Sequence, residues 1–249
     1  QRANGPTDQR ANGPTDQRAN GPTANGLTGQ RANGLTGKRA NGLTMTASMG
    51  KKIGIASLIM MISVLASRFI GLLREMVIAS FGGASTMVDA YQAAFLVPEI
   101  LNHLVASGFL SVTFIPIFTG YLSRGREEDG WHTFSLILTT FGAMLLVLMA
   151  AAFLLAPYLI DILAAGRDDP LFTTLAVRMT RIIIPAQFFF FSGGLFMAVQ
   201  FARGHFSFPA LAPLIYNIGI ILGGILLGPR IGVEGFSWGV LAGAFVGNF

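Results

Sequence analysis

Two arginines and a glutamate interrupt an otherwise apolar stretch of the sequence. The segment ASRFIGLLREMV, residues 66–77, contains Arg68, Arg74 and Glu75. At about 100° per residue on a helix, the three charges fall in one sector of about 120°, with Gly71 near its centre. Because glycine has no side chain, it leaves room on this face. Charged side chains at membrane depth face an internal cavity or a partner, so this sector is a candidate site.

Arginine is the side chain that recognises phosphate through two parallel hydrogen bonds. Two arginines on one membrane-embedded face therefore favour an anionic lipid headgroup as the ligand of Arg68 and Arg74. A structural alternative remains open, in which these arginines only pair with Glu75, Asp89 or Glu99 and lock neighbouring helices together.

A second polar stripe, about 80° wide on a helix, follows in the next apolar segment. It contains Asp89, Glu99 and His103, and Pro98 within it predicts a kink. A histidine on a carboxylate-lined stripe can carry protons. The alternative for His103 is a hydrogen-bonded residue in helix packing. In a later segment, Arg178 and Arg181 share one side, and snorkelling from a helix end is the simpler interpretation of both.

Composition places the chain among membrane proteins. It has 249 residues, 52% of them hydrophobic and 12% charged, with a mean hydropathy of +0.60, whereas soluble domains carry about 25% charged residues. The lack of cysteine excludes disulfides and cysteine-based zinc sites. Residues 1–44 carry +4 of the net charge of +5, so the rest is nearly neutral and nucleic-acid binding is not implied.

Apolar segments separated by turn-forming residues run through most of the chain. A transmembrane helix needs about 20 mostly apolar residues, so we expect an all-α polytopic membrane protein with about six transmembrane helices. The last segment stops at Phe249 without a loop, and we expect the chain to end within its sixth helix. The six segments are residues 53–81, 86–120, 132–164, 171–202, 208–228 and 232–249.

The N-terminal residues 1–44 form an octapeptide repeat of the type QRANGPTD. Its Asn-Gly and Gly-Pro steps favour turns and offer no apolar face. We expect a disordered tail that is not native to the fold, followed by the membrane lobe in residues 45–249. Basic loop residues favour a cytoplasmic N-terminus, and those that would then be cytoplasmic are Lys51, Lys52, Arg124, Arg126 and Arg203.

Sequence signatures of catalysis and metal binding are weak. The chain has no HExxH motif and no phosphate-binding glycine loop after a strand. The neighbouring carboxylates Asp168 and Asp169 fall in an expected loop and are interpreted as solvated. We therefore expect a protein that is not an enzyme, with no cofactor and no metal.

Three stretches make the chain similar to a known family. ASRFIGLLREMVIASFGGASTMVDAYQAAFLVPEIL and GFLSVTFIPIFTGY resemble the start of the MurJ/MviN lipid II flippases, which belong to the multidrug/oligosaccharidyl-lipid/polysaccharide exporter superfamily. FSFPALAPLIYNIGII resembles the fifth helix of that family. The resemblance covers about residues 50–249.

This resemblance implies one lobe of a two-lobe transporter in the bacterial inner membrane. Such proteins bind a polyprenyl-diphosphate-linked glycan, lipid II, in a central cationic cavity and alternate access to it by rocking the lobes. The chain would supply the N-terminal lobe, with membrane lipids around it and a C-terminal lobe as its missing partner. The essential arginines of the family match Arg68 and Arg74, and its acidic positions match Glu75 and Asp89.

One departure from the family concerns its second helix. Many members have an Arg-Arg pair and then Glu-Gly, where this chain has Asn102-His103 and then Ser107-Gly108. The difference leaves two alternatives to lipid II transport. One is an exporter of another polyprenyl-linked oligosaccharide or of a drug. The other is a membrane scaffold for cell-wall synthases that transports nothing.

Overall fold

The structure is a computed structural model that describes residues 54, 58–83, 85–105, 113–167 and 169–249. Every regular element in these ranges is a helix, so the expected all-α class is confirmed. The repeat tail predicted for residues 1–44 lies outside the described residues, and so do Ser107 and Gly108.

Helices occupy all six of the expected segments. The second segment contains three of the described helices and the fourth contains two. The first helix, here called the N-terminal helix, spans residues 58–82. The others are α2 (Thr86–Ala93), α3 (Leu96–Val105), α4 (Ile115–Ser123), α5 (Glu127–Leu163), α6 (Pro170–Ile183), α7 (Ala186–Ala202), α8 (Ser207–Ile231) and α9 (Glu234–Asn248).

Three stretches of the described residues are long and apolar enough to cross a membrane. They are α5, the continuous run of α6 and α7, and most of α8. The structure also shifts two expected boundaries. The helix α5 begins at Glu127 rather than near residue 132, because three acidic residues in its first turn stabilise the positive end of the helix dipole. The helix α8 continues through Pro229 to Ile231.

Pro98 produces the predicted kink, but four residues earlier in the chain. Proline has no N–H and its ring clashes with the carbonyl four residues before it, which here belongs to Ala94. The chain therefore turns at Ala94 and Phe95, between α2 and α3. The hydroxyl of buried Thr180 donates to the Ala94 carbonyl at 3.3 Å, so α6 satisfies the acceptor that the proline leaves open.

A second proline, Pro157, lies inside α5 without ending it. It frees the carbonyl of Phe153, which accepts a hydrogen bond at 3.1 Å from Nε of Arg181. Successive residues of α6 therefore complete the backbone hydrogen bonding of two different helices. This places Arg181 against α5, while Thr180 faces α2 and α3.

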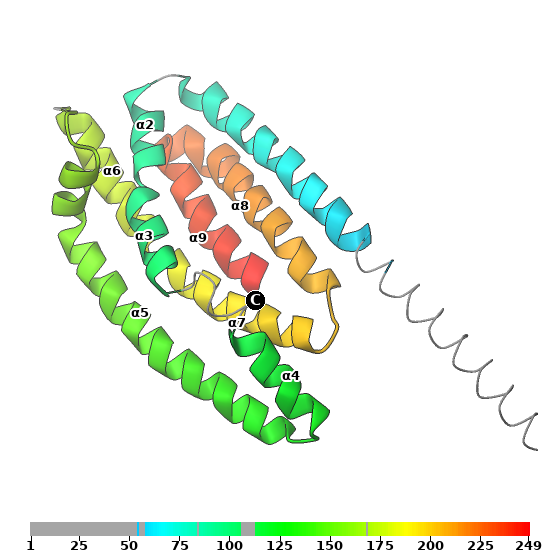
Figure 1. The fold of residues 1–249 in the computed structure, drawn as a ribbon. Coiled ribbons are helices and arrows are strands. Elements are labelled where there is room, and N and C mark those ends of the chain that lie inside the picture. The colour runs from blue at the N-terminus through cyan, green and yellow to red at the C-terminus, as the bar shows by residue number, and fades with distance from the viewer. Residues whose placement is uncertain (1–53, 55–57, 84, 106–112, 168) are drawn as a thin grey trace, which may run out of the picture. The chain divides into compact units, whose positions relative to one another are not determined.

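Close backbone contact joins α8 and α9. A Cβ atom added to Gly223 would lie 2.4 Å from the Cα of Gly239, and one added to Gly219 would lie 2.5 Å from the Cα of Gly243. Small residues allow membrane helices to approach in this way, which strengthens their van der Waals packing. Figure 1 shows α9 between α8 and α6, with the N-terminal helix along the other side of α8.

Two groups of buried side chains hold the helices together. The larger one joins α2, α3, α5, α6 and α9 around residues such as Ile160, Met179 and Phe236. The smaller one packs α4 and the start of α5 against the end of α7, through Phe118, Phe134 and Leu195. The larger group supports both of the cavities discussed below, because α6 and α9 pass through it.

Candidate functional site

Three of the six residues predicted from sequence line one cavity of about 350 Å³, here called the Arg74 cavity. The N-terminal helix supplies Arg74 and Glu75, and α3 supplies Glu99. The kink between α2 and α3 is part of the wall. The remaining lining residues are Tyr91, Gln92, Phe95 and Tyr216.

Arg74 is held in a defined position at the wall of this cavity. Its Nη1 donates to Oδ1 of Asn217 at 3.1 Å, while its Nε and Nη2 donate to Oε1 of Glu75 at 3.2 Å and 2.5 Å. Asn217 is only 8% exposed and donates in turn to the carbonyl of Pro213 at 2.9 Å. The anchor of Arg74 is therefore itself fixed by the backbone of α8.

The chemistry of the Arg74 cavity combines one cation with two carboxylates and two phenols. Three of the five N–H donors of Arg74 are used by Glu75 and Asn217, which leaves two for another acceptor. The side chain of Arg74 is 27% exposed and that of Glu75 is 52% exposed. An anion can therefore reach the guanidinium group, but it must compete with the Glu75 carboxylate.

Arg68 does not share this cavity. It lies six residues before Arg74, about 9 Å along the helix, and lines a separate space of about 290 Å³ between the N-terminal helix, α7 and α8. Within the part of the chain that the structure describes, Arg68 makes no hydrogen bond or ion pair. The predicted common face exists, because both arginines point toward α8, but the structure divides it into two cavities.

Asp89 lies apart from the other predicted residues. Its Oδ2 pairs with Nη2 of Arg167, in the connection between α5 and α6, and both side chains are exposed. The guanidinium group of Arg167 also stacks over the Phe172 ring, 4.8 Å from its centroid. Along the expected stripe, Asp89 on α2 thus pairs with Arg167 while Glu99 on α3 lines the Arg74 cavity, and the turn at Ala94 and Phe95 lies between them.

His103 is exposed and makes a hydrogen bond to its own helix. Its Nδ1 lies 2.8 Å from the carbonyl oxygen of Glu99, to which it donates. Neither His103 nor the neighbouring Asn102 lines the Arg74 cavity. The pair Asn102-His103, where the family resemblance implied two basic residues, therefore lies outside this cavity.

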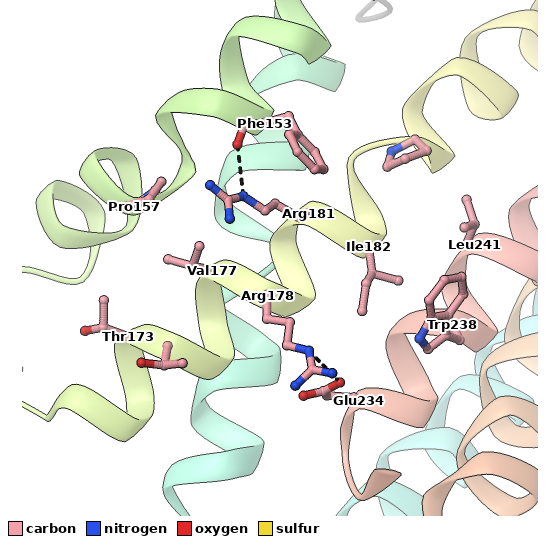
Figure 2. A pocket seen from close by; sticks show the side chains of 12 residues that line it. Phe153, Pro157, Thr173, Val177, Arg178, Arg181, Ile182, Glu234, Trp238 and Leu241 are labelled. Carbon is pink, nitrogen blue, oxygen red and sulfur yellow. Dashed lines mark hydrogen bonds and ion pairs between the residues drawn. The ribbon is translucent and has the colours of Figure 1, made fainter.

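A larger cavity, which sequence reasoning did not predict, lies between α5, α6 and α9 and has a volume of about 710 Å³ (Figure 2). We call it the α6 cavity. Nε of Arg178 forms an ion pair with Oε2 of Glu234 at 3.2 Å, and Arg181 reaches the Phe153 carbonyl. Both arginines thus have partners within the protein in addition to any contact with the membrane surface, and snorkelling stays a prediction. Glu234 lies at the very start of the last expected segment, 232–249, beside turn-forming residues, and no local pattern links it to Arg178.

The sequence also contains a pattern that resembles the nucleophile elbow of hydrolases, GFSWG at residues 235–239. That motif needs a sharp turn between a strand and a helix, which exposes the serine. Here it lies within the continuous helix α9, and Ser237 is 0% exposed. The pattern belongs to the glycine-rich face that packs against α8, and Ser237 has no access to a substrate.

Comparisons with known proteins agree on one family. The model of the family described as "Lipid II flippase MurJ" matches residues 78–247. A probable lipid II flippase MurJ of Thermotoga maritima is 30% identical over 180 residues, covering 72% of this chain and 37% of the relative. The lipid II flippase MurJ of Burkholderia cenocepacia is 31% identical over 182 residues, covering 72% of this chain and 35% of the relative.

A solved structure leads to the same family. It is titled "Lipid II flippase MurJ, inward closed conformation" and superposes with a TM-score of 0.66 at 26% identity, covering 77% of this chain and 40% of the other. The chain therefore spans little more than a third of the length of these relatives. The family match begins at residue 78, so Asp89, Glu99 and His103 lie within it and Arg74 lies four residues before it.

Proposed function

The chain belongs to the lipid II flippase MurJ family, and from this premise we propose that it forms the N-terminal lobe of a lipid II flippase. The substrate is an undecaprenyl-diphosphate-linked peptidoglycan precursor, which is moved across the bacterial inner membrane for cell-wall synthesis. A second lobe supplies the opposite wall of the substrate cavity. The two lobes alternate access by rocking, and no covalent bond is made or broken in the process.

The observation that carries this proposal is the geometry of Arg74. Its guanidinium group is anchored from behind by Asn217 and remains accessible in front, where two N–H groups are free of partners within the described residues. A diphosphate presents the paired oxygens that a guanidinium group binds best. A fixed donor with accessible N–H groups at a membrane cavity is what recognition of a lipid-linked diphosphate requires.

Glu75 gives the site a way to release its ligand. In the structure its carboxylate accepts from Nη2 of Arg74 at 2.5 Å. When a diphosphate enters, it replaces the carboxylate, and Glu75 turns toward the solvent-exposed side. When the lobes change conformation, the Arg74–Glu75 pair re-forms and expels the anion. This exchange makes the ion pair a gate within the cavity.

Arg68 would serve as a second contact along the same helix face. Its cavity is bordered by Pro213, the residue whose carbonyl also anchors Asn217. An anion that moves from Arg68 to Arg74 travels about 9 Å along the helix. Glu99 also lines the Arg74 cavity, whereas Asp89 pairs with Arg167 and His103 bonds to its own helix, both outside that cavity.

For the orientation in the membrane, we propose a multi-pass arrangement with the N-terminus in the cytoplasm. The supporting observation is the distribution of basic residues in short connections. Arg124 and Arg126 lie between α4 and α5, and Arg203 lies between α7 and α8, at the same end of the bundle. With Lys51 and Lys52 this set has five basic residues, against at most four on the other side, namely Arg167, Arg178, Arg181 and Arg230.

The test is transport of lipid II by the product of the gene that encodes this chain, carrying Arg74→Ala. We expect flipping to be lost while the protein accumulates in the membrane at its normal level. The matched control is Arg230→Ala, which removes an equal charge from an exposed residue at the end of α8 that lines none of the three cavities above. Normal flipping by the Arg74→Ala protein would overturn the assignment.

A further inference from the structure

The α6 cavity lies on the other side of α6 from the Arg74 cavity. Thr180 points from α6 to the kink between α2 and α3, which forms part of the wall of the Arg74 cavity. Arg178 is two residues away from Thr180, about 200° around the helix. It faces α9 instead, as Figure 2 shows. The two cavities are therefore separate spaces with no lining residue in common.

Most hydrogen-bonding capacity of the two arginines in the α6 cavity is unused. Arg181 donates through Nε to the Phe153 carbonyl, and Nε of Arg178 faces the carboxylate of Glu234. Within the described residues, the terminal nitrogens of both guanidinium groups have no hydrogen-bond partner. The two residues are three apart on α6, so they lie on neighbouring turns of one face. Arg181 extends toward α5 and Arg178 toward α9, so an anionic headgroup that enters between them meets donors at both ends of the cavity.

The balance of charge in the α6 cavity favours an anion. Two guanidinium groups and one carboxylate line it, so its formal charge is +1. The carboxylate of Glu234 is only 10% exposed, while the side chain of Arg178 is 68% exposed. The negative charge is thus set back in the wall and the positive charge is presented at the opening.

The rest of the α6 cavity is apolar and aromatic. Phe153, Ile182, Trp238 and Leu241 contribute to its wall (Figure 2). A volume of about 710 Å³ is far larger than a phosphate ion needs and falls within the range of sites for sizeable organic ligands. Tryptophan is enriched where membrane helices meet the headgroup layer. A cationic end and an apolar wall match an amphiphile with an anionic head.

We propose that the α6 cavity binds an anionic membrane phospholipid. Its phosphate interacts with Arg178 and Arg181, and an acyl chain lies along Phe153 and Leu241. Basic pockets between transmembrane helices recognise anionic lipid headgroups in this way. This site does not depend on the transport proposed for the Arg74 cavity. Because a polyprenyl diphosphate presents the same phosphate chemistry, the experiment must separate these two lipids.

The chain contains a reporter inside the proposed site. It has two tryptophans. Trp238 lines the α6 cavity, whereas Trp131 lines a different space beside Arg203. In the full chain carrying Trp131→Phe, fluorescence therefore comes from Trp238 alone. The chain is reconstituted in phosphatidylcholine vesicles, and brominated phosphatidylglycerol or brominated phosphatidylcholine is added as a quencher.

We expect brominated phosphatidylglycerol to quench Trp238 at a lower mole fraction than brominated phosphatidylcholine does. Replacing Arg178 or Arg181 by glutamine should reduce this preference by about fivefold for each residue. The control Arg230→Gln should leave it unchanged. Equal quenching by the two lipids, or a preference that survives the Arg178→Gln/Arg181→Gln pair, would overturn the proposal.

Glu234→Gln provides a test that does not depend on the arginine variants folding. It keeps the shape of the side chain but releases Arg178 from its ion pair, so the preference for phosphatidylglycerol should rise about threefold. A fall in preference would contradict the proposed position of the phosphate.

Two competitors identify the source of the phosphate. Inorganic phosphate should leave the quenching unchanged, because it cannot use the apolar wall. Undecaprenyl diphosphate and unlabelled phosphatidylglycerol should displace brominated phosphatidylglycerol at similar mole fractions. Displacement at much lower fractions would reject the phospholipid and make the cavity a second site for the lipid-linked diphosphate. A chain that no longer binds the diphosphate at Arg74 should show unchanged quenching of Trp238 by brominated phosphatidylglycerol.

Discussion

The Arg74 cavity and the α6 cavity both place arginine beside glutamate, but their guanidinium groups differ in the number of hydrogen bonds and in exposure to solvent. Arg74 makes three hydrogen bonds and is 27% exposed. Arg178 has a single ion pair and is 68% exposed. The exposure of the carboxylates differs in the opposite sense, since Glu75 is accessible and Glu234 is nearly buried.

This difference shows that neighbouring side chains determine whether an arginine inside a membrane protein can exchange its partner for a ligand. In the Arg74 cavity the accessible carboxylate can move aside, so the pair can open and close around a ligand. In the α6 cavity the carboxylate is fixed at the start of α9 and the arginine is free to bind outward. The first arrangement suits a transported ligand that must leave, and the second suits a lipid that stays.

The largest difference between the two cavities is expected when the cation is removed from each and the binding of undecaprenyl diphosphate by the reconstituted chain is measured. Arg74→Ala should weaken binding about a hundredfold, because two charge-assisted hydrogen bonds amount to about 3 kcal/mol. Arg178→Ala should change this affinity less than about threefold. Similar losses in both variants, measured by equilibrium titration, would mean that the two cavities are not distinct sites.

Asn217 tests whether the anchoring of Arg74 matters as well as its charge. Asn217→Leu removes the hydrogen bond to Nη1 and should weaken diphosphate binding about tenfold, because the guanidinium group loses its fixed position. The matched control is Asn248→Leu on α9, since Asn248 also donates to the carbonyl four residues before it but lines neither the Arg74 nor the α6 cavity. Equal effects of the two changes would remove the special role of Asn217.

Thr180 tests the contact between α6, which lines the α6 cavity, and the kink beside the Arg74 cavity. Thr180→Val leaves the Ala94 carbonyl without its buried donor and should lower the free energy of unfolding by about 1–2 kcal/mol. Denaturant titration followed by helical circular dichroism measures the change. Thr174→Val is the control, because Thr174 is bonded only to the backbone of its own helix. If Thr180→Val were as stable as the control, the kink would not depend on α6.

The smallest effect is expected from Glu75→Gln, which removes the competitor for Arg74 without changing its anchor. The affinity for undecaprenyl diphosphate should rise about threefold, since a partly exposed ion pair contributes at most about 1 kcal/mol. Glu234→Gln should leave this affinity unchanged, although it alters lipid binding at the α6 cavity. A lower affinity of the Glu75→Gln protein in the same titration would show that the carboxylate helps to position Arg74 for binding rather than competing with the diphosphate.

Much of this architecture could be predicted because helix periodicity is a local property. The common face of Arg68 and Arg74, the approximate helices and the effect of Pro98 all follow from spacing within one segment. The extent of α5 was underestimated, since its acidic first turn resembles a loop in composition. The link from Arg74 to Asn217 spans 143 residues of sequence, and no local pattern could indicate it.

The sequence by itself determined that the chain is an all-helical membrane protein of this family and that Arg74 and Glu75 share a face with Arg68. Only the tertiary structure decided that Arg68 and Arg74 line different cavities, that Asp89 pairs with Arg167, and that Arg178 meets Glu234. The physical reason is the proximity of helices. Periodicity fixes the direction of a side chain on its own helix, but its partner depends on which helix packs there and at what depth.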